Sequence, residues 1–110
     1  MPLYLYELSY TPESIAAQIK KPQDRLQTAA EPILKAAGCK MLGGGYAFGD
    51  HDVVILIEAP NDQTVAAVAQ VVAAGGAVHS AKTTKLLSGS QWKSALRKAG
   101  TIARAYKPAK

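Results

Sequence analysis

The side chains best suited to chemistry in this 110-residue sequence are its two histidines and the acidic residues near them. His51 and Asp52 follow the turn pair Gly49-Asp50, and His79 lies among small residues later in the chain. Near neutral pH, an imidazole can act as an acid, a base or a metal ligand. A nearby carboxylate would orient the ring, so Asp52 is the natural companion of a functional histidine.

Each of these residues also has a structural interpretation that the pattern favours. Asp52 can cap turn amides, His51 can be an exposed turn residue, and His79 can lie on the surface of a strand. A metal site needs three or four converging ligands, and two histidines with the lone Cys39 show no such spacing. We therefore expect no metal and no cofactor. The spacing of the residues also indicates no catalytic pair of a nucleophile and a base.

Tyrosines mark a different kind of site in the first predicted strand, Leu3 to Tyr10. Alternation places Tyr4, Tyr6, Leu8 and Tyr10 on one face, and rings with a polar tip suit a face that is half buried or lines a cavity. In a ferredoxin-like sheet, Tyr6, Glu7 and His79 could line one cleft. The candidate ligand-binding residues are Tyr6, Tyr46, His51, Asp52 and His79.

The elements that must position these residues follow from periodicity and capping signals. Thr11-Pro12 starts a helix that ends near Lys20, and a second helix resumes at about Pro22, kinks at Pro32 and ends at Gly38. The other predicted elements are a strand from Cys39 to Phe48, a strand from Val53 to Ala59, a helix capped by Asn61-Asp62 and ended by Gly75-Gly76, and a strand from Ala77 to Leu87.

The run Gly43-Gly44-Gly45 interrupts the second strand. Glycines there indicate a β-bulge or a close approach of two backbones. A phosphate-binding loop is the alternative, but no Gly-Lys-Ser/Thr ending and no helix follows the glycines. The sequence favours the bulge.

The order strand-helix-strand-strand-helix-strand predicts an α+β, ferredoxin-like βαββαβ fold with a four-stranded antiparallel sheet. Two helices then cover one face of the sheet. The other face needs a second subunit, so we expect a homodimer or a higher homo-oligomer, arranged as a dimeric α/β barrel.

Charge divides the chain into a body and a basic tail. Residues 1–90 carry seven basic and eight acidic side chains, whereas residues 91–110 carry six basic side chains and no acid. We predict a domain over residues 1–88 and a basic C-terminal helix and tail over residues 89–110. The helix, Gln91 to Ala105, presents a stripe that includes Trp92, Leu96 and Ile102, which we expect to pack on the body or on a dimer partner.

The same amphipathic helix could instead bind a nucleic acid or an anionic membrane, but its apolar stripe is rich in alanine and weak for that purpose. We expect no membrane partner and no nucleic acid. The sequence shows no signal peptide and no apolar run of spanning length, and its single cysteine allows no internal disulfide. These features predict a cytoplasmic protein.

The central stretch Gly49-Asp50-His51-Asp52-Val53-Val54, followed by Glu58-Ala59-Pro60-Asn61-Asp62, resembles the GYD domain family. That family is named for a Gly-x-Tyr-Asp signature, with a Glu-Ala-Pro-Asp-Asp segment further on. His51 stands where the family has tyrosine, and Asn61 where it usually has aspartate. The resemblance covers residues 3–87 and implies a ferredoxin-like fold of the dimeric α/β-barrel class, without implying a reaction.

Three functions remain open from the sequence. The first is binding of a small molecule in a cavity of the sheet or of the dimer interface. The second is a cofactor-free enzyme, similar to a monooxygenase or an isomerase, that acts on a small hydrophobic substrate. The third is an interaction module that uses its basic tail.

Overall fold

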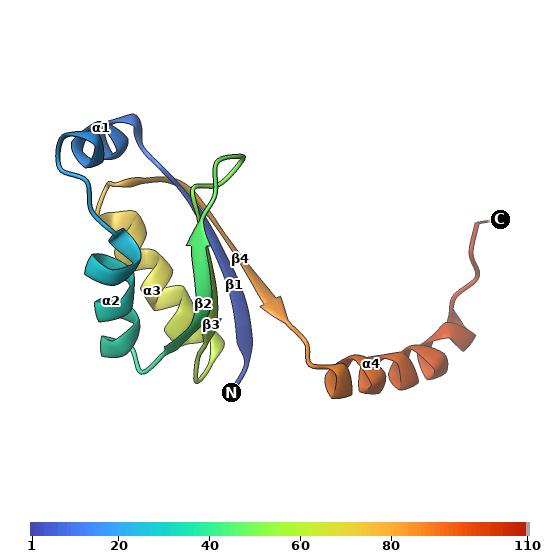
Figure 1. Cartoon of the computed structure of the whole chain (residues 1–110). Helices are drawn as coiled ribbons and strands as arrows, with labels where there is room; N and C mark the ends of the chain where they lie inside the picture. Colours follow the sequence, from blue (N-terminus) through green and yellow to red (C-terminus); the bar gives the residue numbers. More distant parts are fainter. Residues whose placement is uncertain (110) are drawn as a thin grey trace.

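The computed structural model describes residues 1–109, and it is an α+β fold with a four-stranded antiparallel sheet (Figure 1). The order of elements confirms the predicted ferredoxin-like βαββαβ arrangement. Its strands are β1 (Leu3–Tyr10), β2 (Lys40–Tyr46), β3 (Val53–Glu58) and β4 (Val78–Leu86). Its helices are α1 (Pro12–Lys20), η1 (Leu26–Ala30), α2 (Glu31–Ala36), α3 (Asp62–Ala74), α4 (Gly89–Ile102) and η2 (Ala103–Ala105).

The strands lie in the order β2-β3-β1-β4, so β1 is central. It pairs antiparallel with β3 on one side, where Tyr6 lies opposite Ile55. On the other side it pairs with β4, where Tyr6 lies opposite Thr83. Figure 1 shows α2 and α3 on the same face of this sheet, as the topology predicts.

The alternation of β1 and β3 decides which side chains form the core. Tyr4, Tyr6 and Leu8 face the helices and are buried, while the residues between them are only partly buried. In β3, every second residue is likewise buried, because antiparallel partners that lie opposite each other share a face. The buried core comprises Tyr4, Tyr6, Leu8, Leu34, Val53, Ile55, Ile57, Ala59, Val65 and Val68.

The residues predicted to cap the helices do so in the structure. The Thr11 side chain accepts a hydrogen bond from the backbone N–H of Ser14, and Asn61 accepts one from the N–H of Thr64. Gly38 and Gly76 follow α2 and α3 with φ of +74° and +79°, which glycine adopts without strain. Local sequence therefore determines where these helices begin and end.

The second helical segment begins later than predicted, at Leu26 instead of Pro22. The Asp24 carboxylate accepts a hydrogen bond from the Leu26 N–H and starts the helix there. Pro32 falls in the first turn of α2, directly after a π-helical turn in which the Glu31 N–H bonds to the Leu26 carbonyl. The wider turn thus lies where the missing N–H of proline interrupts the regular hydrogen bonding of the helix, and the kink at Pro32 stays a prediction.

The bulge in β2 lies at Leu42, directly before the glycine run, since the pairing with β3 shifts register between Met41 and Gly43. The glycine run itself pairs in regular register with Leu56, Ile55 and Val54. It also brings two backbones close together. A Cβ added at Gly44 would lie 2.7 Å from the carbonyl oxygen of Val54, whereas one added at Gly45 would meet nothing within 4 Å. Gly44 is therefore the position of the run where a side chain is excluded.

We expect Gly44→Ala to lower the free energy of unfolding by about 2 kcal/mol, because the new methyl group must push apart two paired strands. Gly45→Ala is the matched control, and it should leave stability at or slightly above that of the wild type. Urea unfolding of the three proteins measures the difference. Equal stabilities of the two variants would contradict the close approach.

The face of the sheet opposite α2 and α3 has no helix over it in the described chain (Figure 1). We call it the open face. Its apolar side chains are partly buried by their own neighbours, and Glu7 lies opposite Lys82 while Glu58 lies opposite Lys40. Its aliphatic residues are Leu3, Leu5, Val54, Leu56 and Leu86.

The C-terminal segment differs most from the prediction. Its helix begins at Gly89, before the predicted start at Gln91, because Ser88 and Gln91 form a capping box there. Every residue from 87 to 109 is exposed, and Figure 1 shows α4 projecting away from the sheet. We call residues 87–109 the arm. Lys110, the last residue of the predicted tail, lies outside the described residues.

The predicted packing of the arm on the body of its own chain is wrong. Trp92, Leu96 and Ile102 are 59%, 56% and 67% exposed. Only Leu87 and Ser88 separate β4 from α4, and the helix projects away from the core (Figure 1). None of the helices within residues 1–109 has both the length and the apolar character needed to cross a membrane.

Candidate ligand-binding site

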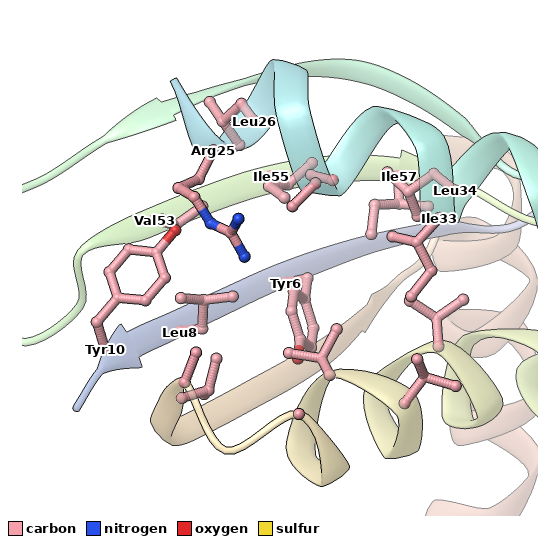
Figure 2. Close-up of a pocket in the computed structure, with 18 residues that line it drawn as sticks. Tyr6, Leu8, Tyr10, Arg25, Leu26, Ile33, Leu34, Val53, Ile55 and Ile57 are labelled. Atoms are coloured by element: carbon pink, nitrogen blue, oxygen red, sulfur yellow. The ribbon is translucent and has the colours of Figure 1, made fainter. Parts of the chain in front are cut away.

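An apolar cavity lies between the sheet and the helices η1, α2 and α3 (Figure 2). It encloses about 260 Å³. Its walls are mostly aliphatic side chains from β1, β3 and the helices, with three polar side chains among them: Tyr6, Tyr10 and Arg25. Small residues on the helices, Ala29, Ala30 and Gly75, leave the space that larger side chains would fill.

The Tyr6 hydroxyl is the unusual polar group of this cavity. Tyr6 is only 4% exposed, and its hydroxyl oxygen has no hydrogen-bond partner among the described residues. Figure 2 shows its ring extending from β1 toward α3. Burial raises the pKa of Tyr6, so the phenol is protonated at neutral pH and can donate a hydrogen bond. A buried polar group without a partner costs stability, and native proteins contain few.

At the other end of the cavity, the Arg25 guanidinium reaches over the sheet toward the Tyr10 hydroxyl (Figure 2). Burial raises the pKa of Tyr10, and Arg25 opposes that rise. Tyr10 is fixed in place by its backbone, because its N–H donates to Asp52 Oδ2 at 2.9 Å. Arg25 donates to Gln23 Oε1 at 3.4 Å, a long and weak contact.

Of the five residues predicted to bind a ligand, Tyr6 lines this cavity and the other four lie elsewhere. Tyr46 is half exposed at the end of β2, where its hydroxyl donates to the Asp24 carboxylate and accepts from the Leu26 N–H. The hydrogen bond from Tyr46 lowers the pKa of Asp24. Tyr46 thus ties the start of η1 to the sheet, close to Arg25 in the sequence.

His51 and Asp52 lie in the loop between β2 and β3 and have separate roles. His51 Nδ1 lies 3.5 Å from Glu7 Oε2 on the open face. The Asp52 carboxylate binds the Tyr10 backbone, and its own N–H donates to the Leu8 carbonyl at 2.8 Å. Asp52 therefore holds β1 against the loop, at the strand position from which Tyr10 enters the cavity.

His79 is exposed at the irregularity in β4 where the pairing with β1 shifts between Ser9 and Tyr10. The shared cleft suggested for Tyr6, Glu7 and His79 is not formed. Tyr6 and Glu7 are adjacent in a strand, so their side chains lie on opposite faces of the sheet. A role in ligand binding for Tyr46, His51, Asp52 and His79 stays a prediction.

Sequence reasoning missed Arg25 and Tyr10 as residues of the site. A signal for Tyr10 was present, because it shares the tyrosine face of β1 with Tyr6. Arg25 had none, since its place over the cavity depends on the helix starting at Leu26 instead of Pro22. The apolar residues of α2 and α3 that line the cavity have the same sequence pattern as core residues, so the sequence could not distinguish the two.

A second tyrosine–carboxylate pair lies at the far end of β1. Tyr4 donates to Asp62, and this hydrogen bond raises the pKa of Tyr4 to about 12. The bond from Tyr4 and a 2.9 Å ion pair with Lys85 lower the pKa of Asp62. These contacts join α3 to the sheet and leave no group free for chemistry. Within residues 1–109, no three side chains of His, Cys, Asp or Glu gather as a metal ion requires.

Comparison with known proteins agrees with the fold. A search of curated proteins finds no match to this chain. The sequence model of the GYD domain matches residues 4–96, a range that includes the sheet apart from Leu3, the helices α1 to α3 and the first part of α4. The match therefore extends beyond residue 88, into the segment predicted to be a separate tail. With most of its length matched, the chain belongs to the GYD domain family.

Proposed function

We propose that this protein binds a small, largely apolar molecule in the cavity between the sheet and the helices. The observation that carries the proposal is an apolar cavity walled in part by Tyr6, whose buried hydroxyl has no hydrogen-bond partner among the described residues. A ligand oxygen that accepts this hydrogen bond would remove the cost of leaving the hydroxyl unpaired. Apolar pockets with a few fixed polar groups are the usual form of small-molecule sites.

The size of the cavity limits the ligand. Pockets for drug-sized molecules enclose roughly 300–1,000 Å³. The cavity here encloses about 260 Å³, so it suits a smaller molecule. Branched aliphatic side chains, such as Ile55 and Val72, surround most of that space and favour a hydrocarbon body in the ligand.

Binding is favoured over catalysis by the chemistry of the cavity wall. The described residues that line it include no histidine, carboxylate, cysteine or lysine. General acid–base catalysis needs a group whose pKa lies near the working pH, and the phenols of Tyr6 and Tyr10 have raised pKa values instead. A cofactor-free enzyme of the monooxygenase or isomerase type remains the alternative, with Tyr6 as its proton donor.

Replacing Tyr6 with phenylalanine tests the proposal. In the free protein, Tyr6→Phe should raise the free energy of unfolding by about 1 kcal/mol, because an unpaired buried hydroxyl is removed. The same change should weaken binding of a small ketone about fivefold, because the ketone loses its donor. The probes are eight-carbon ketones with the carbonyl at carbon 2, 3 or 4, and calorimetry measures their affinities.

Tyr4→Phe is the matched control, since Tyr4 lies on the same face of β1 but bonds to Asp62 outside the cavity. It should lower stability and leave ketone affinity unchanged. Failure of every ketone to bind the wild type would contradict the proposed function. A Tyr6→Phe variant that is less stable than the wild type would show that the hydroxyl is already satisfied.

The proposal includes a homodimer in which the open face of one subunit packs on that of a second copy. The open face combines the aliphatic residues named above with acidic and basic residues that lie opposite each other in neighbouring strands, Glu7 with Lys82 and Glu58 with Lys40. A two-fold axis brings each surface against itself, so acids of one copy can lie near bases of the other. Such packing would complete the dimeric α/β barrel.

The arm is proposed to contact the same second copy. Its exposed stripe leaves from β4, an edge strand of the open face, and its charges are all basic, whereas residues 1–90 carry one more acid than base. The apolar stripe, which a polyanion would leave exposed, favours the body of a partner subunit as its contact. An interaction module that uses the basic arm remains the third alternative. The lone, partly buried Cys39 fits a reducing, cytoplasmic setting.

A further inference from the structure

Among the described residues that line the cavity, Arg25 is the only one with a charged side chain. Two ion pairs are found within residues 1–109, His51 with Glu7 and Lys85 with Asp62, and neither involves Arg25. Its guanidinium makes a long bond of 3.4 Å to Gln23 Oε1 and lies beside the Tyr10 hydroxyl, where it opposes the rise that burial causes in the pKa of Tyr10. A guanidinium carries five donors, so most of the hydrogen-bonding capacity of Arg25 is available to a ligand.

The acids around Arg25 are engaged with other groups. Asp24 accepts hydrogen bonds from the Tyr46 hydroxyl and the Leu26 N–H, and Asp52 accepts one from the Tyr10 N–H. Neither carboxylate lines the cavity. Both raise the pKa of Tyr10 by their charge, which keeps the Tyr10 hydroxyl protonated and able to donate.

All three polar side chains of the cavity are therefore hydrogen-bond donors at neutral pH: Arg25, Tyr10 and Tyr6. No side chain among the described lining residues is an acceptor of comparable strength. A site with donors at one end and aliphatic walls elsewhere matches a ligand with an anionic head and a hydrocarbon body. Because the walls exclude water, the attraction between the two charges is stronger than at the open surface.

We propose that the ligand is a small amphipathic carboxylic acid, bound as its anion with the carboxylate at Arg25 and Tyr10 and the hydrocarbon part against the aliphatic wall. This inference rests on the proposed function, which names the cavity but not the charge of its ligand. The acid head lies where Arg25 reaches over the sheet, and the tail extends toward Ile57 and Leu34 (Figure 2). The Tyr6 hydroxyl then donates a hydrogen bond to an oxygen on the hydrocarbon part of the ligand.

Three probes separate charge from apolar character: octanoate, 1-octanol and acetate. Calorimetry at neutral pH should show the wild type binding octanoate about tenfold more tightly than 1-octanol, as expected of a charge-assisted hydrogen bond. Acetate should bind far more weakly than octanoate, because it has no hydrocarbon body. The preference for octanoate should shrink as sodium chloride is added, because the mouth of the cavity is partly open to screening ions.

Arg25→Gln should remove the preference for octanoate over 1-octanol, while Arg25→Lys should keep part of it. The matched control is Arg97→Gln, which removes an arginine from the exposed arm and should keep the full preference. Circular dichroism verifies that each variant is folded. If Arg25→Gln does not fold, the salt dependence of the wild type and the partial preference of Arg25→Lys provide the test.

The outcomes distinguish this inference from the function on which it rests. Binding of the eight-carbon ketones without binding of octanoate would contradict the inference that the ligand is a carboxylic acid, but it would leave the proposed function standing. Equal affinity for octanoate and 1-octanol in the wild type would do the same, as would an undiminished preference in Arg25→Gln. Failure of both the ketones and the acids to bind would overturn both.

Discussion

Ala30→Leu should abolish binding of small molecules in the cavity, weakening it by more than about 100-fold, a loss of roughly 3 kcal/mol. Ala30 lies on η1, lines the cavity and is partly buried against the core. A leucine there places its side chain in the space that a ligand needs. The free protein should become more stable, because filling a cavity adds contacts without displacing any.

Ala16→Leu is the matched control, since Ala16 is exposed on α1 and does not line the cavity. It should change neither affinity nor stability by a measurable amount. Calorimetric titration with octanoate and the ketones, together with urea unfolding, gives both quantities for each variant. Unchanged affinity in Ala30→Leu would place the binding site elsewhere, and a loss of stability would show that the site is too full to accept a leucine.

Leu56→Asp should dissociate the proposed homodimer, raising its dissociation constant by more than about 1,000-fold. Leu56 lies in β3 in the middle of the open face, opposite Leu5. A two-fold axis would bring two new carboxylates into one apolar interface, and each would lose its hydration without gaining a partner. The fold itself should survive, because Leu56 lies outside the buried core.

Sedimentation equilibrium over the micromolar range measures this change. Ile19→Asp adds the same charge at an exposed aliphatic residue of α1, distant from the open face, and should leave the dimer intact. Leu96→Asp, in the arm, should weaken the dimer to an intermediate extent. A wild-type protein that sediments as a monomer at all concentrations would contradict the dimer and the proposed role of the arm.

Most of the fold could be predicted from the sequence, because the signals that decide it are local. Alternation in β1, the aliphatic run of β3, the caps Thr11 and Asn61 and the glycines after α2 and α3 each act within a few residues. The start of η1 could not be predicted, since it depends on Asp24 being held by Tyr46 from a distant strand. The direction of the arm could not be predicted either, because the periodicity of an apolar stripe does not show which surface the stripe packs against.

The site was predictable only in part, for a related reason. Alternation placed Tyr6 on the face that lines the cavity, although the sequence left open whether that face is half buried or lines a cavity. The histidines were candidates only because an imidazole can act as an acid, a base or a ligand. In the structure, His51 lies on the open face and His79 on an exposed part of β4, and neither lines the cavity. Arg25 could not be predicted as a site residue, because its position at the cavity depends on how η1 packs over the sheet.

The most direct measurement of the central claim is the position of a bound probe. Methyl groups of isoleucine, leucine and valine can be labelled with carbon-13, and nuclear Overhauser contacts to a saturating eight-carbon ketone can then be recorded. Binding in the cavity predicts contacts to the methyl groups of Ile33, Ile55 and Val72, which line it. Contacts confined to Leu5 and Leu56 of the open face, or none at all, would contradict the account.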